Sequence, residues 1–474
     1  MPRFITLLTR LLSLPLVIVS APLALLAAAA CNLTAEPPAT LQVRLSTPLP
    51  TPAPAIRPTA TPPVGISSVR PIDPSVHALL ERVQNDRLMF AVSSLTNLQT
   101  RHVLSATDNP SRGIGAARDW LLGQFDALRA AYPQKEIDIW TQPVQFNWRR
   151  LDVRSENIVA VFPGADVGAG VIVVGAHYDS IGADPFNGNA PAPGANDNAS
   201  GVAALLEIAH IMAPVPHRAT LVFVAFTAEE TGRQGSIAFV QNYLQAQNPP
   251  IAIRGMINLD MIGSDRGPGR QRDARTMRLF SADPNDSASR QLARQFALIA
   301  NTYVTDMNVV MQSAVDRVGR WGDHQSFSEA GYAAVRLIQG IEDPARQHGP
   351  QDTLENVQLD YLMRATRVAL AGIIILADGP AAPPLLALRP SAESPGVLRL
   401  SWLPVPGASG YLIALRNASS LFYDQILTIT PGDRSEVEWD GFGRYASIAI
   451  SAMDANGRMG PFSVEYAIAS LRRP

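Results

Sequence analysis

Short apolar segments rich in Val and Ile alternate with longer helix-forming segments through the middle of the chain, and this alternation constrains the fold most. Six segments have the length and composition of strands buried on both faces: residues 157–162, 171–177, 219–226, 255–260, 278–281 and 334–339. Five longer segments predict helices: residues 113–131, 201–213, 236–247, 287–301 and 359–377. This order predicts an α/β fold with a mixed, largely parallel central sheet flanked by helices.

The pattern changes after the proline-rich residues 378–384. Apolar and polar side chains then alternate at period two, as in residues 397–402 and 411–416, so we expect residues 385–474 to form an all-β sandwich. This segment resembles a fibronectin type III domain, because Trp402 in LSWLPVPGASGYLI is followed by Tyr411. It carries no catalytic motif, which favours a spacer, with a contact to cell wall or a protein partner as the alternative.

The N-terminal 31 residues have the composition of an export signal. Arg3 and Arg10 precede an uncharged apolar run at residues 11–30, which ends at Cys31. Three readings stay open: a bacterial lipoprotein signal with a lipidated Cys31, an uncleaved membrane anchor, and plain secretion. All three export the remaining chain, as a cell-surface lipoprotein or a secreted protein. Residues 32–74 are rich in Pro and Thr and predict an extended linker.

Charge and cysteine content exclude several classes of function. The chain has 474 residues and a formal net charge of −2, whereas nucleic-acid-binding proteins usually carry a basic face, so we expect no nucleic-acid partner. Cys31 is the one cysteine, so neither an intramolecular disulfide nor a cysteine-based zinc cluster can form. Any metal ion must therefore be held by His, Asp and Glu.

Acidic and histidine side chains follow the predicted strands. His177 closes one strand, and Asp179 stands two residues further on, where it could accept the second ring N–H of that histidine. Glu229 and Glu230 follow another strand, and since adjacent side chains diverge, one can bind a metal ion while the other remains a free base. Asp260 lies between apolar residues and needs a partner there.

Two further candidates lie in loops. Asp197 stands in PGANDNASG just before a predicted helix, where Asp, Asn and Ser commonly cap the helix, yet one helix needs fewer caps than this run offers. His348 lies in a loop before the last helix and could equally be an ordinary loop residue. Taken together, these histidines and acids form a donor set that suits zinc, and a bridging carboxylate would hold two ions about 3.5–4 Å apart.

The motifs GAHYDS, PGANDNASG, FTAEETGRQGS, NLDMIG, GDHQSF and HGPQDT occur in this order. In these motifs the segment from about residue 90 to 378 resembles the co-catalytic zinc aminopeptidases, which share a superfamily with aminopeptidase Y, glutamate carboxypeptidase and glutaminyl cyclase. The resemblance implies a zinc-peptidase fold over residues 75–379 and an aminopeptidase that binds two Zn²⁺ ions and cleaves peptides.

The resemblance also implies a role for each residue of the motifs. His177 and Asp260 would hold one zinc ion, Glu230 and His348 the other, and Asp197 would bridge the two. Glu229 would be the general base for the attacking water, and Asp179 would orient His177. His324 would stabilise the oxyanion, with a histidine held by Asp323 as the rival interpretation.

Other functions of the superfamily remain open. A carboxypeptidase would read a free carboxylate with arginines, for which the chain offers Arg254, Arg266, Arg270, Arg317, Arg320 and Arg336. A glutaminyl cyclase typically uses one zinc ion, whereas the full donor set favours two. A non-catalytic, peptidase-like surface protein would have lost donors that are all present here.

Overall fold

The computed structural model describes residues 66–67, 72–384 and 386–471 of the chain. The predicted export signal at residues 1–31 and most of the predicted linker lie outside the described residues and stay predictions. The described residues all belong to one compact unit of the chain. Within them, no helix is both long enough and apolar enough to cross a membrane.

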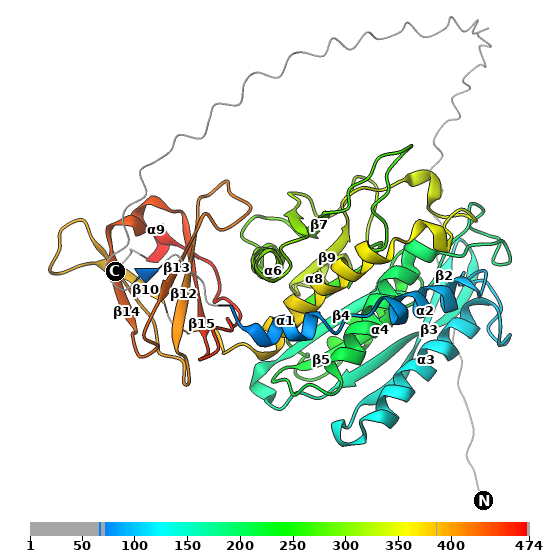
Figure 1. Cartoon of the computed structure of the whole chain (residues 1–474), viewed down its shortest axis with the longest axis horizontal. Helices are drawn as coiled ribbons and strands as arrows, with labels where there is room; N and C mark the ends of the chain where they lie inside the picture. Colours follow the sequence, from blue (N-terminus) through cyan, green and yellow to red (C-terminus); the bar gives the residue numbers. More distant parts are fainter. Residues whose placement is uncertain (1–65, 68–71, 385, 472–474) are drawn as a thin grey trace, which may run out of the picture. The chain divides into compact units, whose positions relative to one another are not determined.

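A mixed sheet of eight strands forms the centre of the peptide chain between residues 138 and 339 (Figure 1). In spatial order the strands are β2 (Asp138–Trp148), β3 (Leu151–Phe162), β5 (Thr220–Phe226), β4 (Val171–His177), β6 (Ile253–Leu259), β9 (Ala334–Gln339), β7 (Thr276–Ser281) and β8 (Asn308–Met311). The four neighbours β5, β4, β6 and β9 are parallel, and antiparallel pairs flank them. The predicted α/β class is thereby confirmed.

Helices cover both faces of this sheet. They are α1 (Pro74–Leu80), α2 (Asn85–Thr96), α3 (Gly113–Ala131), α4 (Ser200–Met212), α5 (Gln234–Phe239), α6 (Ala288–Tyr303), α7 (His324–Glu329) and α8 (Leu359–Asp378). Side chains alternate along a strand, so Ile172 and Val174 of β4 pack in the cluster that includes α2, α3, α4 and α8. Val173 points the other way and packs with Phe239 of α5 and Phe327 of α7.

Two antiparallel sheets follow the central α/β body. One contains β10 (Ala387–Pro390), β11 (Leu398–Ser401) and β14 (Glu436–Trp439). The other runs in the order β1 (Ile66–Ser67), β13 (Gln425–Ile429), β12 (Gly410–Arg416), β15 (Ser447–Met453) and β16 (Tyr466–Ala467), and the short helix α9 (Ile468–Leu471) ends the described chain. Trp402 and Tyr411 meet edge to face at 5.0 Å in the core between the sheets. The predicted all-β C-terminal region is confirmed at this level.

Part of the predicted linker has regular structure. Ile66 and Ser67 form β1, which pairs antiparallel with Ile429 and Thr428 of β13. Asp73 caps α1 by accepting a hydrogen bond from the Ser75 N–H at 2.8 Å, and α1 begins at Pro74, one residue before the predicted domain boundary.

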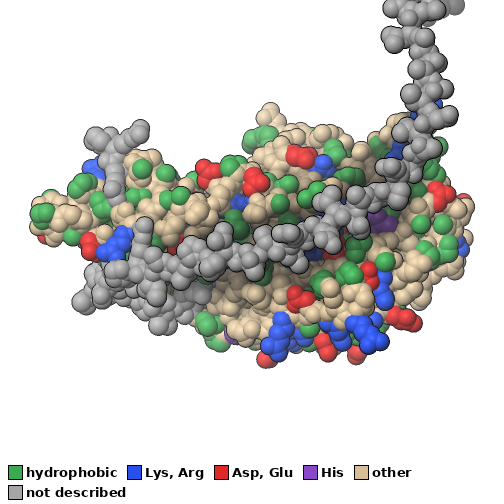
Figure 2. Space-filling view, turned by 90° about the horizontal axis from the view of Figure 1, so that it is seen from above, with side chains coloured by type: hydrophobic (Ala, Val, Ile, Leu, Met, Phe, Trp, Pro, Cys, Tyr) green, Lys and Arg blue, Asp and Glu red, His purple; other side chains and the backbone are tan. Residues whose placement is uncertain are grey.

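The second sheet of the sandwich packs on the α/β body. Leu412, Met453 and Phe462 belong to the same apolar cluster as α6 and α8. Buried Arg294 of α6 pairs with Glu465 at 2.6 Å, and Arg458 reaches both Asp73 and Asp378. On the face seen in Figure 2, acidic and basic side chains lie interspersed, in keeping with a net charge close to zero.

Candidate metal centre

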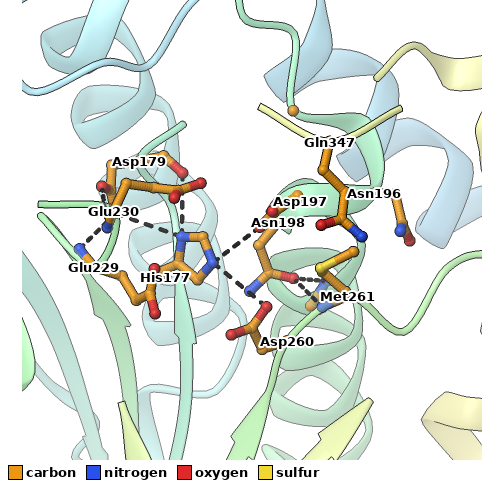
Figure 3. A network of polar contacts seen from close by, with 12 residues as sticks. His177, Asp179, Asn196, Asp197, Asn198, Glu229, Glu230, Asp260, Met261 and Gln347 are labelled. Atoms are coloured by element: carbon orange, nitrogen blue, oxygen red, sulfur yellow. Dashed lines mark hydrogen bonds and ion pairs between the residues drawn. The ribbon is translucent and has the colours of Figure 1, made fainter. Parts of the chain in front are cut away.

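The candidate site lies where the central parallel strands end. His177 is the last residue of β4, Glu229 and Glu230 follow β5, and Asp260 follows β6. Because these strands are parallel and adjacent, their carboxyl ends meet at one edge of the sheet, which is where open α/β sheets bind ligands. In Figure 3, His177 stands at this edge with Asp179 on one side and Asp197 and Asp260 on the other.

Asp197 lies between two imidazoles and offers one carboxylate oxygen to each. The Nε2 atom of His177 is 3.3 Å from Asp197 Oδ1 and 3.5 Å from Asp260 Oδ1. The Nε2 atom of His348 is 3.3 Å from Asp197 Oδ2 and 3.3 Å from Glu230 Oε2. The structure therefore brings all five predicted metal ligands together, in two groups that share Asp197.

Asp179 connects His177 with the two glutamates. The Nδ1 atom of His177 lies 3.2 Å from the Asp179 backbone oxygen and 3.5 Å from its carboxylate, which places the ring proton on Nδ1 and leaves Nε2 free for a cation. The Asp179 carboxylate also accepts the backbone N–H groups of Glu229 at 3.1 Å and Glu230 at 3.2 Å. One side chain thus orients the imidazole and fixes the turn that carries both glutamates.

In the loop that carries Asp197, a different residue caps helix α4. Asn198, not Asp197, accepts the N–H of Gly201 at the start of α4, and its amide donates to the Leu259 carbonyl. The backbone N–H groups of Asn196 and Asp197 donate to Asp352 at 3.0 and 2.8 Å. The side chain of Asp197 is therefore free to face the imidazoles.

Two supporting residues were missed in the sequence. Asp352 holds the Asp197 loop from 155 residues further along the chain. Arg101 is fully buried, and within the described part of the chain its guanidinium donates only to backbone carbonyls, those of Leu95, Tyr178, Pro193 and Gly194. No local motif surrounds Arg101, so only the fold could reveal that it joins the loop after β4 to the loop before Asp197.

The residues present fit a metal ion. His177, Asp197 and Glu230 each offer one donor atom, and these atoms lie within 4.8 Å of one another. The Oε1 atom of Glu230 is buried and has no hydrogen-bond partner among the described residues. Burial raises the pKa of Glu230 well above its ordinary value, and the Asp197 charge adds to that rise. Crowded, buried carboxylates of this kind need cations, and nitrogen and oxygen donors suit zinc.

Glu229 and His177 show the same electrostatic crowding. Burial raises the pKa of Glu229 well above its ordinary value; His177 opposes this shift and Asp260 reinforces it. Burial by itself would lower the pKa of His177, but Asp260 and Glu229 outweigh it and raise that pKa well above the ordinary range.

His324 lies apart from this group. It is the first residue of α7, its ring is fully buried, and its Nε2 atom is 2.9 Å from the Val315 backbone oxygen. Burial lowers its pKa to about 4, so the ring is neutral at pH 7. Both carboxylate oxygens of Asp323 are buried without a hydrogen-bond partner in the described part of the chain, so Asp323 does not hold His324 by a hydrogen bond.

A cavity of about 240 Å³ opens onto the donor set. Five of the residues that line it belong to the candidate site: Asp197, Glu229, Glu230, Asp260 and His348. The other residues that line it are Ile181, Met261, Arg317, Gly319, Arg320, Trp321 and Arg336. His324 is not among the described residues that line the cavity, and neither are three of the arginines considered for a carboxylate site, Arg254, Arg266 and Arg270.

Imidazoles and acids around a shared carboxylate, with a further buried glutamate beside them, define a metal-dependent hydrolase. Comparison with known proteins identifies the family to which this hydrolase belongs. A profile of "Peptidase family M28" matches residues 157–373. A "Probable zinc metalloprotease" of Pyricularia oryzae is 35% identical over 385 residues, covering 74% of this chain and 76% of the relative. Another of that name, from Phaeosphaeria nodorum, is 31% identical over 413 residues, covering 77% and 81%.

The solved structures agree on the fold. The LapA aminopeptidase of Legionella pneumophila superimposes with a TM-score of 0.51 at 22% identity, covering 65% of this chain and 76% of that one. The chain therefore belongs to peptidase family M28 and is a zinc metallopeptidase. The predicted resemblance to the zinc aminopeptidase superfamily is confirmed.

Proposed function

We propose that this protein is an aminopeptidase that uses two zinc ions to remove N-terminal residues from peptides. The observation that carries the proposal is the position of Asp197, whose two oxygens each lie 3.3 Å from a different imidazole. A carboxylate that serves two ligand groups at once is what a two-metal hydrolase requires.

The donor groups would divide between the ions. His177 and Asp260 would hold one ion, Glu230 and His348 the other, and Asp197 both. Bound zinc would supply Lewis acidity to the substrate carbonyl and to water. Asp179 would keep Nε2 of His177 directed at its ion.

Glu229 would move the proton. Its carboxylate lines the cavity, and its backbone is fixed by the N–H bond to Asp179 at 3.1 Å. Burial raises the pKa of Glu229. A buried carboxylate beside the metal site is the kind of group that can take a proton from water and return it to a leaving amine. Glu229 has no place in the proposed donor groups and is free for this role.

The substitution Glu229→Gln tests the assignment. We expect the variant to keep two zinc ions per chain by elemental analysis, and its kcat on leucyl-anilide to fall at least about 100-fold. The matched control Glu136→Gln removes an exposed carboxylate and should leave both values unchanged. A Glu229→Gln rate near that of the wild type would remove Glu229 from the base role.

A substrate panel separates the aminopeptidase from its alternatives. Aminoacyl-anilides report an aminopeptidase, N-blocked dipeptides a carboxypeptidase, and cyclisation of an N-terminal glutamine a glutaminyl cyclase. We expect turnover of the anilides by protein carrying two zinc ions. Turnover of the blocked dipeptides alone, or of none of the three, would contradict the proposal.

A further inference from the structure

Three arginines line the cavity above the donor set: Arg317, Arg320 and Arg336. An arginine is charged at any physiological pH, and a buried or half-buried guanidinium needs polar partners, of which a carboxylate is the strongest. Which of the three already has such a partner decides what the cavity can bind.

Arg317 and Arg336 are neutralised by the protein. Arg336 is fully buried and pairs with Asp260 Oδ2 at 2.9 Å and Asp316 Oδ2 at 2.8 Å. Arg317 pairs with Asp316 at 3.1 Å and with Glu342. Both guanidinium groups are therefore part of the framework of the site.

Arg320 is different. Its guanidinium donates to the side-chain oxygen of Gln347 at 2.6 Å, which is a neutral partner, and it makes no ion pair with any described residue. Gln347 also donates to Glu342, but that carboxylate is already shared by Arg278 and Arg317. Among the described residues, no carboxylate thus lies within ion-pair distance of Arg320 in the cavity.

The position of Arg320 brings its positive charge close to the candidate metal site. Its partner Gln347 is the chain neighbour of His348, whose imidazole lies 3.3 Å from Asp197 and from Glu230. The next residue, Trp321, is 46% exposed and also lines the cavity. A substrate bound at the metal centre would therefore extend past the guanidinium of Arg320 and the exposed side chain of Trp321.

We propose that Arg320 binds a carboxylate of the substrate, so that the enzyme prefers peptides with a negative charge on a residue flanking the scissile bond. This inference rests on the proposed aminopeptidase function. A guanidinium suits this ligand because it can offer two parallel N–H groups to the two carboxylate oxygens. The acids that line the cavity do not compete for Arg320, because they belong to the proposed metal ligand set and its base.

The carboxylate can come from two sources. It can be the side chain of an acidic N-terminal residue, or the free C-terminus of a dipeptide. Each source has its own substrate pair. Glutamyl-anilide and its uncharged γ-methyl ester test the side chain, and leucyl-leucine and leucyl-leucinamide test the C-terminus.

The experiment compares kcat/KM within each pair for the wild type, Arg320→Gln, Arg320→Lys and the control Arg270→Gln. Arg270 is exposed and outside the cavity, so its loss matches the change in net charge. We expect the acid to be favoured by about 10- to 100-fold in one pair, which is the range of a charge-assisted hydrogen bond. This ratio should fall at least about tenfold in Arg320→Gln, be partly kept in Arg320→Lys, and be unchanged in Arg270→Gln.

Two outcomes would overturn the inference: no preference for the acid in either pair, or a preference that survives Arg320→Gln. Failure of the proposed function looks different, since no substrate, charged or neutral, would then turn over. In that case we would measure by calorimetry how tightly the same substrate pairs bind to zinc-loaded Glu229→Gln protein, with and without the Arg320→Gln substitution. Tighter binding of the acid that depends on Arg320 supports the carboxylate site, and equal binding refutes it.

Discussion

Single side chains at this site are held by partners far away in the sequence. Arg101 donates to carbonyls on both sides of the metal-binding region, at Tyr178 after β4 and at Gly194 before Asp197. Desolvation by burial lowers the pKa of Arg101 to about 10, which still leaves it charged at pH 7. Its buried charge is stabilised by these carbonyls and by nearby carboxylates, those of Asp352 and Asp179 first. Arg101 thus ties the segment after His177 to the segment before Asp197.

Replacing Arg101 should therefore weaken metal binding. In Arg101→Met we expect the zinc affinity to fall by about 10- to 100-fold, as is typical when a group that supports metal ligands is lost. Arg101→Lys keeps the charge but loses the planar set of N–H donors, so its zinc affinity should lie between those of Arg101→Met and the wild type. The zinc that each protein retains after dialysis against a competing chelator measures the effect, and circular dichroism confirms folding. The control is Arg129→Met, which lies on the exposed face of α3. Wild-type retention in folded Arg101→Met would contradict this role.

At the scale of elements, α6 and α8 pack against each other at a glycine. A Cβ atom on Gly372 of α8 would lie 2.1 Å from a ring carbon of Phe296 in α6. Both residues are in the main apolar core, so the ring has little room to move. The helices pack at this distance because position 372 has no side chain.

The substitution Gly372→Ala should lower the free energy of unfolding by about 1–3 kcal/mol, since the cost of overpacking exceeds the gain in helix propensity. The matched control is Gly123→Ala in the exposed part of α3, where a Cβ atom meets nothing within 4 Å. That change should raise the free energy of unfolding by about 0.5–1 kcal/mol. Urea unfolding followed by circular dichroism measures both, and opposite signs are expected; a stabilised Gly372→Ala would show that α6 and α8 can separate freely.

The elements also show what a sequence can predict. Strand β9 and helix α3 match their predicted bounds because they are buried or amphipathic over their whole length. Strand β2 was missed because it lies at the sheet edge and carries polar residues and Pro143, and α7 because six residues are too few to show a helical period. The five predicted metal ligands follow from strand ends and motifs. Arg101 lies in no motif, and Asp352 lies in HGPQDT, but the long-range contacts of both residues cannot be read from the local sequence.

At the scale of the whole molecule, the β-sandwich and the α/β body share buried charge as well as apolar contacts. Glu465 of the sandwich pairs with Arg294 of α6 at 2.6 Å and with Arg416 of β12 at 2.5 Å, and all three side chains are at most 6% exposed. A contact of this kind differs from that of a domain on a flexible linker. We infer that the sandwich stabilises the α/β body and unfolds together with it.

Removing one partner of this network tests the inference. In Glu465→Gln two arginines lose their buried anionic partner, which should cost about 3–5 kcal/mol. Calorimetry should show one unfolding transition in both proteins, shifted to lower temperature in the variant. Glu436→Gln, whose side chain is 57% exposed, should leave the transition in place. Two separate transitions in the wild type, only one of them shifted by Glu465→Gln, would mean that the sandwich folds on its own.

Strand β1 has a mechanical consequence. Ile66 and Ser67 close the outer edge of β13, so the chain that precedes them joins the folded protein at the sandwich and not at the catalytic sheet. A pull from any tether upstream of Ile66 would first load this short backbone ladder. The pairing of β1 with β13 in the sandwich would then take up the force before this force can distort the strand ends where His177 and Asp260 lie.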